Sequence, residues 1–307
     1  MIEAIRIGNG PIIHPGLSDS IGVNINGPSL VKRPDWAPGP GRYMLYFAHH
    51  HGKHIRLAFA DELAGPWTIH KPGVLPLEET PLTLQRLDLP QPDWAVEIGT
   101  DAYIPHLASP DVHLNAEKQR FEMLFHGLEK DGVQRSYAAV SPDGLAWTVE
   151  GPAIDQTYLR RFEHRGDFYA VALYGQLLRG LPDGGYELGP NPLPDRIRHV
   201  GILKRGDGLH VLFTRYEDAP ERILHIALSL NGDWHNWKAV GEPAEVLRPE
   251  RDWEGASLPV EGGKVGATGF VNALRDPFLF EDGDKIYMIY CGGGEAALGL
   301  AEVTGID

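Results

Sequence analysis

The sequence has a single cysteine, Cys291, among its 307 residues, so it forms no internal disulfide and implies no oxidising compartment. No apolar run approaches the roughly 20 residues of a membrane-spanning helix. Basic residues are also few: 28 Lys+Arg against 42 Asp+Glu give a net charge of −14, which argues against a nucleic-acid partner. Because no apolar signal-peptide core is present, we expect a cytoplasmic protein with no membrane partner, unless a leader has been removed.

Glycine and proline are frequent, at 37 and 25 residues, as in proteins built from short strands joined by turns. A β-rich pattern repeats along the chain, and each copy has three or four short apolar runs bounded by Gly, Asp and Asn. Four-stranded units repeated around an axis are propeller blades. The sequence therefore predicts an all-β, five-bladed β-propeller forming a single domain over residues 1–307, with blades at about residues 24–70, 106–150, 158–190, 197–240 and 273–303.

The fifth copy has no outer strand of its own. We expect the N-terminal segment, residues 2–7 or 11–13, to supply that strand and close the ring. The alternative is a β-sandwich with accidental internal similarity. Five matches in the same order favour the propeller.

This topology predicts one functional mouth. In an up-and-down blade, the start of the inner strand lies at the same end as the turn between strands 2 and 3 and the connection to the next blade. Two long insertions, about residues 72–105 and 240–272, are both such connections. Long loops on a rigid scaffold often carry function, so we expect the site at this end of the axis.

Four carboxylates are candidates for acid–base chemistry. Asp111 and Asp276 each precede a strand at the same expected position of their blades, and we expect both to face the axial funnel. Glu295 follows three glycines that let a backbone approach a ligand closely. Glu254 adjoins Trp253, an aromatic side chain suited to a sugar face. Two carboxyl groups are what glycoside hydrolysis requires, although each of these residues could instead serve a turn or an ion pair.

Histidines gather at the same predicted mouth. Consecutive strand residues alternate faces, so at most two of His49, His50 and His51 converge without a bend. We favour contact with substrate for this run and for Lys53, over a structural role or a metal site. His126 occupies the equivalent turn of the next blade. No cofactor is predicted, although a calcium-like or histidine-bound central metal ion stays open as an alternative.

The mouth is expected to be cationic, in contrast to the acidic protein as a whole. An anionic sugar such as a uronate, or a phosphate, would account for this. Alternatively, the arginines only neutralise adjacent carboxylates. The predicted substrate-binding residues are Asn26, His49, His50, His51, Lys53, His126, Glu163, Arg215, Arg275 and Trp253, and the other cationic candidates are Arg160 and Arg198.

The chain resembles the five-bladed propeller glycosidases, the superfamily of family 43 arabinanases and xylosidases with families 32, 68, 117 and 130. The resemblance covers about residues 24–303 and is most like divergent family-43-like proteins. The motifs that carry it are Ser109-Pro110-Asp111-Val112, Arg275-Asp276-Pro277, Ser141-Pro142-Asp143-Gly144-Leu145-Ala146-Trp147, Gly294-Glu295, Asn26-Gly27-Pro28-Ser29 and Tyr46-Phe47-Ala48-His49-His50.

The resemblance implies a catalytic base Asp in blade one, an Asp that tunes pKa values in blade two and an acid Glu in blade three. Asp111 matches the second position, and Glu163 is a loose candidate for the third. Blade one presents Asn26-Gly27-Pro28-Ser29, with no carboxylate, so the family set is incomplete. Another carboxylate or a histidine would have to take that role.

The sequence thus predicts a glycosidase acting on an oligosaccharide, one that contains an acidic sugar. A lyase or a glycoside phosphorylase on the same fold is an alternative. A non-catalytic carbohydrate-binding propeller is a third hypothesis. The oligomeric state is not predicted.

Overall fold

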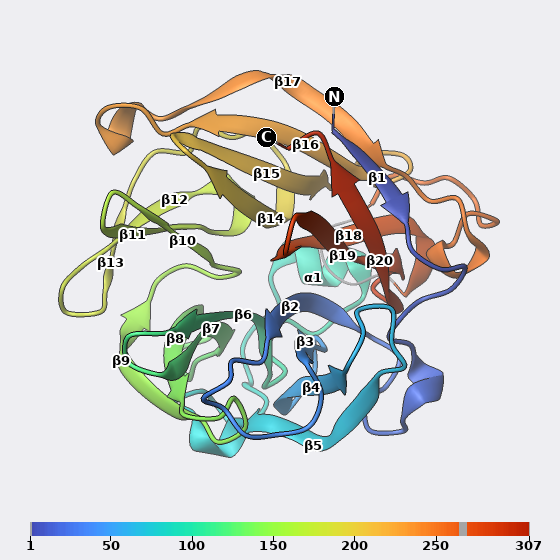
Figure 1. The fold of residues 1–307 in the computed structure, drawn as a ribbon. Helices are drawn as coiled ribbons and strands as arrows, with labels where there is room; N and C mark the ends of the chain where they lie inside the picture. The colour runs from blue at the N-terminus through green and yellow to red at the C-terminus, as the bar shows by residue number, and fades with distance from the viewer. Residues whose placement is uncertain (1, 264–268, 307) are drawn as a thin grey trace.

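A computed structural model describes residues 2–263 and 269–306. Five four-stranded antiparallel sheets form a ring around a central axis (Figure 1), which confirms the predicted five-bladed propeller. Blade I contains β2 (Asn26–Lys32), β3 (Tyr43–Ala48), β4 (His54–Ala60) and β5 (Thr68–Pro76), and blade II contains β6 (Leu107–Asn115), β7 (Arg120–Leu128), β8 (Gln134–Ser141) and β9 (Thr148–Ile154).

The other three blades follow in chain order. Blade III contains β10 (Arg160–His164), β11 (Asp167–Val171), β12 (Leu177–Gly180) and β13 (Tyr186–Leu188), and blade IV contains β14 (Ile197–Arg205), β15 (Gly208–Arg215), β16 (Ile223–Ser229) and β17 (Lys238–Leu247). Blade V contains β18 (Phe270–Asp282), β19 (Lys285–Gly294), β20 (Ala297–Thr304) and β1 (Glu3–Arg6).

Strand β1 closes the ring, as predicted. It pairs antiparallel with β20, with Glu3 opposite Thr304, and so supplies the outer strand of blade V. The Arg6 guanidinium at the end of β1 forms an ion pair with the buried Glu254 carboxylate at 2.7 Å. The first and last strands of the chain therefore share one sheet.

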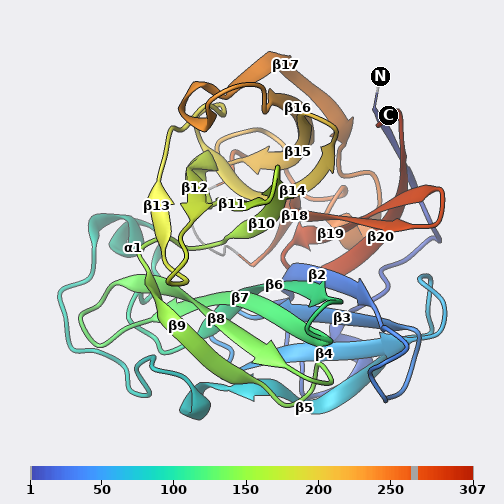
Figure 2. The same cartoon turned by 60° about the vertical axis from the view of Figure 1, so that its left-hand side comes forward.

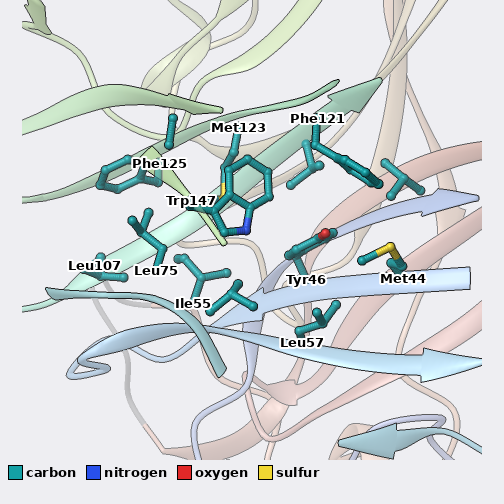
Figure 3. Packing of buried hydrophobic residues seen from close by; sticks show 14 of the residues in the cluster. Met44, Tyr46, Ile55, Leu57, Leu75, Leu107, Phe121, Met123, Phe125 and Trp147 are labelled. Carbon is teal, nitrogen blue, oxygen red and sulfur yellow. The ribbon is translucent and has the colours of Figure 1, made fainter. Parts of the chain in front are cut away.

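Five apolar clusters fill the five interfaces between neighbouring blades. Figure 3 shows the cluster between blades I and II, where Tyr46 of β3 and Phe121 of β7 both pack near Trp147. Trp67 and Trp237 are likewise buried in such clusters.

Three inner strands carry the same bulge. In blades I, II and V the register shifts over Asn26/Ser29, Ala108/Asp111 and Arg275/Phe278. Each shift contains a residue with positive φ followed by proline: Gly27 (55°), Ser109 (50°) and Asp276 (48°). A bulge re-aims side chains, and here it does so beside the axis at one end of three blades.

The two long connections lie where the topology places them. The connection from β5 to β6 contains the one α-helix in the described part of the chain, α1 (Asp93–Ile98), which is seen behind the centre of the ring in Figure 1 and at one side in Figure 2. The connection from β17 to β18 contains a 3-10 turn at Asp252–Glu254. No helix in the described residues is long and apolar enough to cross a membrane.

Candidate active site

A pocket of about 510 Å³ opens at the predicted mouth of the propeller. Its walls come from the segment before β2, the turns between strands 2 and 3 of blades I, II and V, and both long connections. The lining residues that bear on chemistry are Asn24, His49, His50, His51, Trp94, Asp101, His106, Gln134, Tyr158, Phe270 and Glu295. The topology predicts four of these residues, His49, His50, His51 and Glu295, at this mouth, and the structure brings them together.

Glu295 is the carboxylate of this pocket, and it is only 7% exposed. Its Oε2 accepts hydrogen bonds from the side-chain amides of Asn24 and Asn26, both at 2.9 Å, and pairs with His50 Nε2 at 2.7 Å. Its Oε1 has one weak contact, 3.5 Å from Arg275 Nη1. Among the described residues, Oε1 is therefore the oxygen with lone pairs left for a ligand.

The Glu295–His50 pair is charged. Burial opposes ionisation of Glu295, but the charges of His50 and Arg275 and the Asn24 amide outweigh it and hold the pKa of this carboxyl well below its ordinary value. Burial alone would lower the pKa of His50, yet the adjacent carboxylate raises it above 6.5. The pocket thus places an anion and a cation in contact.

A second carboxylate–histidine pair lies close to the first. Asp276 is fully buried, and its Oδ1 is ion-paired with His199 Nδ1 while its Oδ2 accepts the Gly27 backbone N–H at 3.0 Å. Burial raises its pKa and His199 lowers it, with a net lowering, and the nearby Glu295 charge acts in the opposite direction. Tyr158 stacks on the His199 ring at 3.9 Å between centroids and separates this pair from the pocket.

Arg275 ties the two pairs to blade IV. Its Nε donates to Oε2 of buried Glu221 at 2.8 Å, and Arg198 pairs with Oε1 of the same carboxylate. Thr214 donates a third hydrogen bond to Glu221 at 2.9 Å. These bonds hold the Arg275 guanidinium beside Glu295, with Nη1 at 3.5 Å from Oε1.

The other histidines of the site are neutral. Burial lowers the pKa of His49 and of His106 to about 4, and it lowers that of His51 in the same direction. His126 is fully buried, and its ring lies 4.2 Å from that of Tyr158; burial and the neighbouring His106 lower its pKa well below the ordinary value. His126 therefore lies behind the pocket wall rather than in it.

Exposed apolar side chains surround the pocket opening. Trp94 of α1 is 40% exposed, and Phe270 at the start of β18 is 52% exposed, and both line the pocket. Val23 on the adjacent wall is also exposed. Flat aromatic faces beside a polar floor suit a ligand with alternating apolar and hydroxyl surfaces.

Asp111 is not equivalent to Asp276, and the expectation of one shared position is wrong. In the strand register, Asp276 of blade V corresponds to Ser109 of blade II, which lies two residues before Asp111. Asp111 lines a different pocket of about 360 Å³, which shares no lining residue with the first. There it binds His113 at 2.7 Å and Arg160 at 3.3 Å; burial opposes ionisation, but these partners lower its pKa to about 2.

Glu254 and Trp253 lie outside the pocket lining. The Glu254 carboxylate is fully buried and binds Arg6, the Tyr290 hydroxyl and two backbone N–H groups. Trp253 packs on Tyr290 and against Gly292 and Gly299. These contacts join the last connection to blade V, so the acid–base hypothesis for Glu254 finds no support in its geometry.

Three further predicted binding residues are also absent from the pocket lining. Lys53 and Glu163 are exposed, on the β3–β4 turn and on β10. Arg215 is ion-paired with Asp218 at 3.2 Å. Side-chain direction, which strand counting does not give, separates these residues from their neighbours in the site.

The arginines expected to make the mouth cationic are each paired with a carboxylate. Arg160 contacts Asp111, Arg215 contacts Asp218, and Arg198 and Arg275 share Glu221. The structure therefore agrees with the alternative in which these arginines neutralise neighbouring carboxylates.

The described residues contain no group of three or more His, Cys, Asp or Glu side chains arranged to hold a metal ion. In the histidine run, His50 is engaged by Glu295, and the rings of His49 and His51 are 6.0 Å apart.

Sequence reasoning missed Tyr158, Trp94 and Phe270 as pocket residues, and Glu221 as the partner of Arg275. Tyr158 lies just before the inner strand of blade III, so a search of the segments that precede inner strands would have found it. Trp94 and Phe270 lie in or beside the two long connections, where no periodic pattern marks direction.

One protein of similar sequence is an uncharacterized protein of Acanthamoeba polyphaga mimivirus. The two are 34% identical over 310 residues, covering 92% of this chain and 84% of the viral protein. The chain belongs to the family of this viral protein. No family model matches the sequence.

Solved structures share the fold. A family 43 β-xylosidase/α-arabinofuranosidase from a compost metagenome, solved with xylotriose, has a TM-score of 0.59 and 11% identity, covering 98% of this chain and 94% of that one. A putative glycoside hydrolase from Bacteroides ovatus has a TM-score of 0.63 and 12% identity, covering 97% and 95%. An exo-1,5-α-L-arabinanase from a bovine ruminal metagenomic library has a TM-score of 0.53 and 13% identity, covering 94% and 96%. The fold is that of the family-43-like propeller glycosidases, as the resemblance implied.

Proposed function

We propose that the protein is a glycoside hydrolase that cleaves an oligosaccharide containing an acidic sugar in the pocket around Glu295. The observation that carries this proposal is the charged Glu295–His50 pair at the floor of a pocket with aromatic walls. The fold, which several glycoside hydrolases share, supports it.

Each member of the pair has a role that fits its charge. The Glu295 carboxylate stabilises the positive charge that develops at the anomeric carbon. His50 Nδ1 makes no hydrogen bond to the described residues, so protonated His50 can donate a proton through it. Water adds to the anomeric carbon as the glycosidic C–O bond breaks, the leaving oxygen takes the proton from His50, and the proton that water releases returns to His50.

The first test is a panel of neutral and uronate-containing oligosaccharides, with products read by mass spectrometry. Hydrolysis adds one water in total. Glu295→Gln should lower kcat roughly 10³-fold, because the neutral amide no longer stabilises the oxocarbenium-like charge. Glu302→Gln is the matched control, because this carboxylate of the same blade is paired with Lys285 outside the pocket and should leave kcat unchanged.

The chemistries that compete with hydrolysis give different products. An unsaturated product without added water would indicate a lyase, and sugar release that requires phosphate would indicate a phosphorylase. Binding without turnover, unchanged in Glu295→Gln, would favour a carbohydrate-binding propeller. Full activity of Glu295→Gln on a verified substrate would contradict the proposed role of this residue.

The pH profile tests His50 separately. Glu295 raises the pKa of His50 above 6.5 against the effect of burial, so the imidazolium persists to higher pH than in a free histidine and is lost as pH rises through the raised value. We expect kcat to fall on this alkaline side and His50→Gln to remove that limb together with most of the activity. A kcat that rises through the same pH range would identify His50 as a base instead.

A further inference from the structure

One arginine beside the pocket has no carboxylate partner. Arg56 of β4 is 7% exposed, and its Nε and Nη1 atoms are buried without a hydrogen-bond partner or ion pair among the described residues. A buried guanidinium without a counter-charge is strongly unfavourable. Such an unsatisfied group in a folded protein calls for a bound ion, water or ligand.

Arg56 does not itself line the pocket, but it lies beside His49, which does. A Cβ atom at Gly22 would be 4.0 Å from Arg56 Nη2 and 3.4 Å from the His49 ring, so these two side chains flank the same residue. His49 lines the pocket, as do Val23 and Asn24, which follow Gly22 in the chain. Gly22 has no side chain, so none fills the position beside Arg56 Nη2 and the His49 ring.

The polar groups beside Gly22, Arg56 Nη2 and His49 Nε2, are hydrogen-bond donors. His49 Nδ1 accepts the His51 backbone N–H at 2.9 Å, so in the neutral ring the proton is on Nε2, which is 3.5 Å from the Gly22 Cβ position. Burial keeps His49 neutral, with Arg56 adding to the effect, at a pKa of about 4. Burial also lowers the pKa of Arg56, to about 10, which leaves it charged at neutral pH.

We propose that Arg56 and His49 form an anion subsite of the pocket that binds the carboxylate or sulfate group of an acidic sugar. Arg56 Nη2 can donate a charge-assisted hydrogen bond to such a group, and the imidazole N–H can supply a second. The subsite rests on the proposed function, in that the pocket takes an oligosaccharide, and it specifies which substrates that function prefers. The four arginines first expected to select an anion are all neutralised, whereas Arg56 is not.

The test compares two probes that differ in one group: methyl β-D-glucuronide, with a carboxylate, and methyl β-D-glucoside, with a hydroxymethyl group. Isothermal titration calorimetry should show at least about tenfold tighter binding of the glucuronide to the wild-type protein. Arg56→Met should lose this preference and keep its affinity for the glucoside. The control Arg42→Met removes a half-exposed guanidinium of the same blade and should change neither affinity. Equal binding of both probes to the wild type overturns the subsite.

Thermal unfolding in anion-free buffer separates a binding role from a structural one. Because Arg56 has no partner to lose, Arg56→Met should keep or raise the Tm, and glucuronide should raise the Tm of the wild type but not of the variant. A lower Tm of Arg56→Met without anion would mean that the guanidinium is structural, which overturns the proposal. Galactose 6-sulfate and inorganic sulfate are tested in parallel, and a response to inorganic sulfate alone identifies an adventitious ion only and also overturns it.

These measurements need no turnover, so the two proposals fail separately. Charge-dependent binding that is lost in Arg56→Met, with no product from any oligosaccharide, keeps the subsite and overturns the hydrolase. Equal kcat/KM on neutral and acidic oligosaccharides, unaffected by Arg56→Met, overturns the subsite and keeps the hydrolase.

Discussion

At the scale of the residue, Gly27 connects the bulges of three blades. Its backbone N–H donates to Asp276 of blade V, and its Cα faces Ser109 of blade II so closely that an added Cβ would lie 3.0 Å from Ser109 Cα. Its φ of +55° is also in the left-handed region that favours glycine. The position of Asp276 therefore depends on a residue without a side chain in the neighbouring blade.

Gly27→Ala should lower the free energy of unfolding by about 2 kcal/mol, from left-handed strain and from contact with the Ser109 backbone. Gly206→Ala is the matched control: its φ is +51° and nothing lies within 4 Å of its Cβ position. It should show the strain alone, about 1 kcal/mol. Urea denaturation measures both, and equal losses would mean that the Ser109 contact adds nothing.

At the scale of the element, β1 holds the ring closed through more than its backbone pairing. Arg6 donates to buried Glu254 through Nε and Nη2, to exposed Glu250 through Nη1 and to the Arg248 carbonyl. Glu254 is also held by Tyr290 of β19. The first strand, the last connection and blade V thus share one ionic network.

Arg6→Met should cost about 3 kcal/mol of unfolding free energy, because it leaves the Glu254 carboxylate buried without its cation. Glu250→Gln breaks only the exposed half of the network and should cost less than about 1 kcal/mol. Denaturant unfolding measures both variants, and similar losses would show that the buried Arg6–Glu254 pair stabilises the fold no more than the exposed Arg6–Glu250 pair. Neither variant touches the pocket, so affinity for a bound sugar should not change.

At the scale of the whole molecule, buried ionisable groups link stability to pH. His106 has a pKa lowered to about 4 from 6.5, and Asp111 one lowered to about 2 from 3.8. A group whose pKa is depressed in the folded state contributes stability above its unfolded pKa and loses it as pH falls through the folded value. The stability that His106 contributes is therefore lost between pH 6.5 and about 4, and the stability that Asp111 contributes is lost between pH 3.8 and about 2.

We expect the free energy of unfolding to fall on acidification from pH 6.5, by roughly 3 kcal/mol from His106 and about 2 kcal/mol from Asp111. Thermal or urea unfolding across this range measures the decrease. His106→Asn keeps a donor for the Ile104 carbonyl, which His106 Nδ1 contacts at 2.8 Å, but removes the titrating ring. The variant should lose less unfolding free energy between pH 6.5 and 4 than the wild type. An identical pH dependence would contradict the contribution of His106.

The fold and the end of the axis that holds the pocket could be predicted from the sequence. Strand alternation, turn residues and repeated order are local properties, and they sufficed for five blades and for a closing N-terminal strand. Chain topology then placed His50 and Glu295 at one mouth, because strand connections alternate between the two ends of a blade.

Only the tertiary structure decided which of those residues meet. Asp276 lies within a bulge beside the site, whereas Asp111 lies two residues beyond the equivalent bulge position and lines another pocket, because a bulge changes where the side chains around it point. The partner of Glu254 is Arg6, 248 residues away, and no local pattern reveals such a pairing. For the same reason, the sequence does not reveal that Arg56, unlike Arg198 and Arg275, has no carboxylate partner among the described residues.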